Sequence, residues 1–102
     1  MIRINRRFQL EVEKLGKKTI FQVTVYERTG TRSKGKRLFA ETQVEDPYHF
    51  RVQFIVRDAP DFDSLLKTFL EQLAFRGYTP IRYRLKEEDN GWSDWINIPP
   101  SP

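Results

Sequence analysis

The chain contains no cysteine and only one histidine, His49. The two residue types that most often act as nucleophiles, general bases or metal ligands are therefore absent or nearly so. Without cysteine there can be no disulfide, no thiolate metal site and no cysteine nucleophile. One histidine is too few for a histidine-rich metal site, and no serine stands in a recognisable catalytic pattern with it. The sequence therefore predicts no catalytic residue, no metal and no cofactor, and we expect the protein not to be an enzyme.

Long apolar stretches are also absent from the sequence. No run approaches the roughly 18 residues that a membrane-spanning helix requires. The opening residues MIRINRRFQL alternate apolar and polar side chains, unlike the apolar centre of a signal peptide. We expect a soluble cytoplasmic protein that binds no membrane. The length of 102 residues is typical of one domain, 1–102, in which residues 87–102 form an irregular tail rich in Trp and Pro.

Alternation of apolar and polar residues predicts four strands in the first 57 residues. The first strand places Ile2, Ile4, Phe8, Leu10 and Val12 on one face. The next three run through Phe21–Val25, Leu38–Val44 and Tyr48–Val56. Glycine-containing turns and short connections favour antiparallel neighbours, and Pro47 ends the third strand.

At Asp58 the apolar period changes from two residues to about 3.6. The sequence predicts an amphipathic helix over residues 59–76, with an apolar stripe of Phe62, Leu65, Leu66, Phe69, Leu70 and Leu73. Alternation then returns in TPIRYRLKE and predicts a fifth strand. The predicted fold class is α+β, an antiparallel sheet of about five strands in the order β-β-β-β-α-β with the helix packed on one face.

The sheet face opposite the helix is expected to be too apolar for simple solvation and too polar for a core. It mixes Tyr26, Phe39 and Ile55 with a set of polar residues: Gln22, Gln53, Arg51, Arg57, Arg82 and Arg84. We expect the tail to lie across part of this face through Trp92, Trp95, Ile96 and Ile98, and a second copy of the chain to hide the rest. The sequence thus favours a non-enzymatic binding or assembly module that contacts itself, as a homodimer, or another protein.

The stretch RTGTRSKGKR, residues 28–37, supports an alternative function. Its five cations are Arg28, Arg32, Lys34, Lys36 and Arg37, and residues 1–57 as a whole carry 13 Lys or Arg against 6 acidic residues. In single-stranded DNA or RNA binding, these cations and Arg51, Arg82 and Arg84 would contact phosphates, while Tyr26, Phe39 and Trp92 would stack on bases. The sequence favours the simpler interpretation of this stretch as a solvated hairpin tip.

Overall fold

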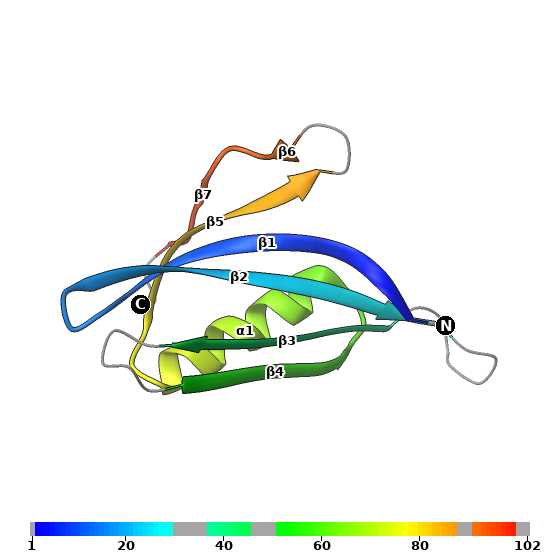
Figure 1. Cartoon of the computed structure of the whole chain (residues 1–102), viewed down its shortest axis with the longest axis horizontal. Helices are drawn as coiled ribbons and strands as arrows, with labels where there is room; N and C mark the ends of the chain where they lie inside the picture. The colour runs from blue at the N-terminus through cyan, green and yellow to red at the C-terminus, as the bar shows by residue number, and fades with distance from the viewer. Residues whose placement is uncertain (1, 30–36, 46–50, 88–90, 100–102) are drawn as a thin grey trace.

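The computed structural model describes residues 2–29, 37–45, 51–87 and 91–99, which form one antiparallel sheet and one helix (Figure 1). The elements are β1 (Ile2–Lys14), β2 (Lys17–Arg28), β3 (Arg37–Glu45), β4 (Arg51–Ala59), α1 (Phe62–Phe75), β5 (Thr79–Glu87), β6 (Gly91–Trp92) and β7 (Ile96–Asn97). The strand order is β4-β3-β2-β1-β5-β6, and β7 also pairs with β5.

The α+β class, the antiparallel sheet and the single helix on one face are confirmed. The sheet has seven strands instead of about five, because two short segments of the tail pair with β5. Each of these segments is only two residues long, and such a length shows no alternation in a sequence.

The β1–β2 hairpin closes through the shortest common connection. Lys14 lies opposite Lys17, and the two residues between them, Leu15 and Gly16, have positive φ angles of 52° and 81°. Two consecutive left-handed residues match the right-handed twist of the strands that they join. Gly16 adopts this conformation easily, whereas Leu15 carries a side chain that disfavours it.

The helix begins at Phe62, after an N-cap at Asp61. The predicted helix started at residue 59, but Asp61 has an extended backbone and follows a proline, so residues 59–61 are not helical. The Asp61 carboxylate accepts a hydrogen bond of 2.8 Å from the backbone N–H of Ser64. This bond holds the pKa of Asp61 below its ordinary value of 3.8. The chain leaves the helix through Gly77, where φ is 86°.

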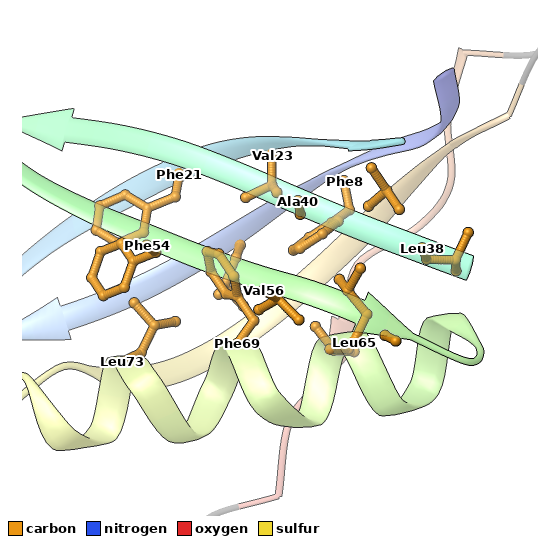
Figure 2. Close-up of a cluster of buried hydrophobic side chains, with 14 of the residues drawn as sticks. Phe8, Phe21, Val23, Leu38, Ala40, Phe54, Val56, Leu65, Phe69 and Leu73 are labelled. Carbon is orange, nitrogen blue, oxygen red and sulfur yellow. The ribbon is translucent and has the colours of Figure 1, made fainter. Parts of the chain in front are cut away.

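The core lies between α1 and one face of the sheet (Figure 2). Phe8, Phe54 and Phe69 are at most 1% exposed, and the rings of Phe8 and Phe69 meet edge to face with centroids 5.8 Å apart. Full burial of each such side chain contributes roughly 1.5–3 kcal/mol before entropy is counted. The core therefore uses one face of the sheet and leaves the opposite face to other contacts.

A β-bulge in β1 reverses the orientation of its first residues. The register with β2 shifts between Ile4 and Arg6, so Ile4 lies opposite Tyr26, on the face away from the helix. Ile2 and Ile4 are 56% and 48% exposed, whereas Phe8 is buried. The prediction that Ile2 and Ile4 share the face of Phe8 is therefore wrong.

The physical reason for this bulge is a buried carboxylate on the helix-facing side of β2. Glu27 is only 5% exposed, at a position where the alternation of β2 otherwise places valine. The bulge turns Arg3 and Asn5 toward it, so that Arg3 Nε lies 3.1 Å from Glu27 Oε1 and the Asn5 amide donates to the same oxygen at 3.3 Å. A straight strand would direct isoleucine at this carboxylate and leave it without these donors.

Candidate interaction surface

Four apolar side chains form a stripe on the sheet face away from α1. Ile4 lies directly opposite Tyr26 on β2, and Tyr26 lies directly opposite Phe39 on β3. The rings of Tyr26 and Phe39 stack, with centroids 5.3 Å apart and an angle of 21° between their planes. Ile2 extends this row along β1. We call these four residues, Ile2, Ile4, Tyr26 and Phe39, the apolar stripe.

A pocket of about 550 Å³ adjoins the stripe between β3 and β4. We call it the arginine pocket, and its lining includes three arginines, two carboxylates and two large apolar side chains: Arg28, Arg37, Arg57, Glu41, Asp58, Phe39 and Ile55. The Arg28 guanidinium lies 5.2 Å from the centroid of the Phe39 ring, within the range of a cation–π contact. The pocket thus combines charged groups of both signs with apolar side chains.

A second β-bulge shapes this pocket. Leu38 pairs with Ala59 and Ala40 pairs with Val56, so Arg57 and Asp58 together face the single residue Phe39. Asp58 has a φ of 62°, a left-handed conformation that aspartate tolerates better than most residues. Its carboxylate lies 3.2 Å from Arg37 Nε. This pair is exposed and contributes little to stability. With Glu41 also in the lining, the pocket holds three arginines and two carboxylates.

A ladder of cations and tryptophans occupies the other side of the same face, along β5. The guanidinium of Arg82 lies 4.4 Å from the Trp95 ring, and that of Arg84 lies 4.6 Å from Trp95 and 5.2 Å from Trp92. Lys86 lies 5.6 Å from Trp92. The tail therefore folds back on the sheet through its two tryptophans, as the sequence predicts.

The two arginines of this ladder are further held by polar groups of β1. Arg82 Nε lies 3.2 Å from a Glu11 carboxylate oxygen, and Arg84 Nε donates to Gln9 Oε1 at 2.8 Å. Ile98 behaves differently from the tryptophans, because it packs against the helix-side core. Ile96 lies directly opposite Tyr83, which also packs against this core. The tail thus wraps around the β5 edge, and the expectation that Ile96 and Ile98 lie on the open face is wrong.

The structure divides the predicted site residues into separate groups. Tyr26, Arg28, Arg37 and Phe39 meet at the stripe and its pocket, whereas Arg82, Arg84 and Trp92 meet in the ladder. Arg51 is exposed at the start of β4. The predicted contacts Arg32, Lys34 and Lys36 and the single histidine, His49, lie outside the described residues.

Sequence reasoning missed Ile4 as a member of the surface. The available signal was Glu27, an acidic residue on the apolar parity of β2, which requires donors from a neighbouring strand. This signal can be used only if the register that places Arg3 opposite Glu27 is known. The alternation within β1 alone indicates instead that Ile4 faces the helix.

Within the described segments, no three His, Cys, Asp or Glu side chains gather as a metal site would require. The described part also holds no helix with the length and apolarity needed to span a membrane. Comparison with protein-family models, curated proteins and solved structures found no match for this chain.

Proposed function

We propose that this protein is a small non-enzymatic assembly module that pairs with a second copy of itself through the apolar stripe. The observation that carries this proposal is the row Ile4, Tyr26 and Phe39 across three neighbouring strands, on the face that α1 leaves uncovered. Ile2 and Ile4 are about half exposed in the single chain. Aromatic and apolar side chains bordered by arginine are enriched in protein interfaces, and a symmetric pair buries the same patch twice.

The contacts within the chain favour a protein partner over stacked bases. Phe39 already receives the ring of Tyr26 and the guanidinium of Arg28. Trp92 likewise receives cations from β5. A base that stacked on these rings would have to displace a group that is already in place, whereas side chains of a second protein can cover the stripe without doing so.

Measurement of the mass in solution over a range of protein concentrations tests the proposal. Wild type is expected to reach the mass of two chains, and Ile4→Glu is expected to weaken pairing about tenfold or more by burying a charge at the interface. Gln22→Glu is the matched control, because it adds the same charge on the same face, at an exposed position of β2 away from the stripe. Wild type that keeps the mass of one chain at millimolar concentration would refute the proposal.

Binding of single-stranded nucleic acid is the second candidate, and the arginine pocket supports it. Arg28 and Arg37 are the first and last residues of the basic stretch 28–37, and both line the pocket with Arg57. A titration of labelled oligonucleotides should then show log affinity falling linearly with log salt concentration, with a shallower slope in Arg57→Gln. Oligonucleotides that fail to bind even at low salt would reject this candidate.

A further inference from the structure

The first residues of β1 have two possible registers with β2. In the observed register, Ile4 lies opposite Tyr26, after the bulge between Ile4 and Arg6. If β1 continued from Arg6 without a bulge, Ile4 would lie opposite Glu27 instead. A shift of one residue moves a side chain to the other face of the sheet. The two registers therefore place Ile4 on opposite faces, and only the observed one brings it to the apolar stripe.

Burial of apolar side chains alone favours the register without the bulge. Along β1, Ile2 and Ile4 have the same parity as Phe8 and Leu10, which are fully buried in the core. A strand without the bulge would turn both isoleucines toward that side, whereas the observed register leaves them 56% and 48% exposed. A specific interaction must therefore oppose this gain and hold the bulge.

The carboxylate of Glu27 provides the opposing interaction. It is buried, and it accepts hydrogen bonds from Arg3 Nη2 at 3.4 Å and from the Asn5 amide at 3.3 Å, with Arg3 Nε 3.1 Å away. Without the bulge, Arg3 and Asn5 would point to the opposite face, and the carboxylate would lose these donors. The loss of charged donors from a buried carboxylate is costly, so the bulged register is the more stable one.

The other charged groups near the bulge do not decide the register. Arg6 donates from Nε to Asn5 Oδ1 at 3.3 Å and lies 4.7 Å from the centroid of the Phe62 ring on α1. The pairing of Arg6 with β2 is the same in both registers. In a strand without the bulge, Arg3 would lie opposite Arg28, and like charges directly opposite repel. Both guanidinium groups are exposed, so solvent screens this repulsion.

We propose that Glu27 is a positioning residue for the apolar stripe, because its buried carboxylate holds the bulge that brings Ile2 and Ile4 to the open face. An apolar side chain at position 27 would need no donors. Burial would then draw the isoleucines to the helix side, and only Tyr26 and Phe39 would remain of the stripe. The effect on self-pairing rests on the proposed function, whereas the register of β1 does not.

Nuclear Overhauser effects between side chains test the register directly. In wild type, the methyl groups of Ile4 should be close to the Tyr26 ring. Glu27→Val is expected to remove these contacts and to bring the Ile4 methyls close to the side chain at position 27. Glu27→Gln keeps a carbonyl oxygen that can accept hydrogen bonds, so it should retain the wild-type contacts. Contacts between Phe8 and Phe69 report whether the core stays folded in each variant.

A deletion gives the matched rescue. Removing Asn5 takes out the extra residue of the bulge, so Ile4 faces Tyr26 in a strand that needs no bulge. Adding this deletion to Glu27→Val should therefore restore the contacts between Ile4 and Tyr26. In measurements of mass in solution, Glu27→Val is expected to weaken self-pairing about tenfold, and the added deletion should recover it. Glu13→Val removes the same charge at the far end of β1 and should change neither the register nor self-pairing.

The outcomes separate this proposal from the proposed self-pairing. A wild type that remains a single chain would refute self-pairing, and the register measurements would still decide the role of Glu27. That role is overturned if Glu27→Val loses the core contacts, if it keeps the contacts between Ile4 and Tyr26, or if it shifts the register and still pairs as tightly as wild type.

Discussion

The guanidinium of Arg3 lies 3.1 Å from the carboxylate of Glu27, and the two partners differ sharply in exposure. The Arg3 side chain is 69% exposed, whereas that of Glu27 is 6% exposed. The cationic partner reaches in from solvent and compensates a charge that the fold has buried.

Removing the Arg3 cation should therefore lower the free energy of unfolding by more than the loss of an exposed salt bridge would. Arg3→Met is expected to lower the free energy of unfolding by about 1–3 kcal/mol, because a buried carboxylate loses its charged donor. The double variant Arg3→Met/Glu27→Leu should be more stable than Arg3→Met alone. Urea denaturation measures both changes, and Arg7→Met on the same strand is the control. Equal effects of the Arg3 and Arg7 variants would contradict this account of the bulge.

A substitution at Leu15 in the β1–β2 turn should stabilise the protein. Leu15 is 75% exposed and holds a φ of 52°, which costs a residue with a bulky side chain about 1–2 kcal/mol. Leu15→Asn creates an Asn-Gly turn and is expected to raise the free energy of unfolding by about 1 kcal/mol. Leu15→Ala keeps the unfavourable conformation and should give a smaller gain. Thermal and urea denaturation of the two variants compare them, and an unstable Asn variant would rule out strain at this turn.

The N-cap of α1 should contribute stability in a pH-dependent way. The folded pKa of Asp61 lies below its ordinary value, so its contribution is present above pH 3.8 and is lost as pH falls through the folded pKa. Asp61→Ala should lower the urea midpoint at pH 7, and the difference from wild type should shrink as the pH is lowered past 3.8. Asp61→Asn caps without titrating, so its advantage over alanine should persist at low pH. A constant difference between wild type and Asp61→Ala would contradict this assignment.

The tail should depend on Trp95 for its attachment to β5. This ring contacts both Arg82 and Arg84, and Trp95→Ala is expected to remove about 1–2 kcal/mol of stability through the two cation–π contacts. Hydrogen exchange at the Leu85 amide should become faster, because that amide donates to Ser93 of the tail. Ile96→Ala, at a residue that is 42% exposed, is the control. Unchanged exchange in the tryptophan variant would show that the backbone pairs alone hold the tail.

Most of the fold could be predicted from the sequence, because apolar residues repeat every two residues in the strands and about every 3.6 residues in the helix. Phe21, Val23 and Val25 alternate and are buried as expected. The spacing of Leu65, Phe69 and Leu73 likewise identifies the face that α1 buries. In each case local periodicity and tertiary burial agree, and a pattern read within one segment is sufficient.

The β-bulges between Ile4 and Arg6 and between Leu38 and Ala40 could not be predicted in this way, because each depends on a neighbouring strand. Alternation in β1 places Ile4 with Phe8, but a donor requirement at Glu27 overrides it. The left-handed backbone of Asp58 similarly brings Arg57 to the pocket through the register between β3 and β4. Both features decide which side chains reach the candidate surface, so the surface was less predictable than the core.

The ladder on β5 was anticipated only in part. A pair of tryptophans three residues apart indicates that the tail packs on the body of the protein, and it does so. Composition cannot show that Arg82 and Arg84 are the groups on which the rings rest. The register between β1 and β5, which places Glu11 and Gln9 beside these arginines, is likewise invisible within the β5 segment alone.

The cover that the tail places on β5 also limits the size of any assembly built by edge pairing. A sheet with two receptive flanks can recruit copy after copy and grow into a filament, whereas a sheet with one receptive flank stops after a single addition. Residues 91–99 thus cover the β5 edge against a further strand through β6 and β7. Without these residues, β5 would present an unpaired edge of the kind that promotes association between sheets.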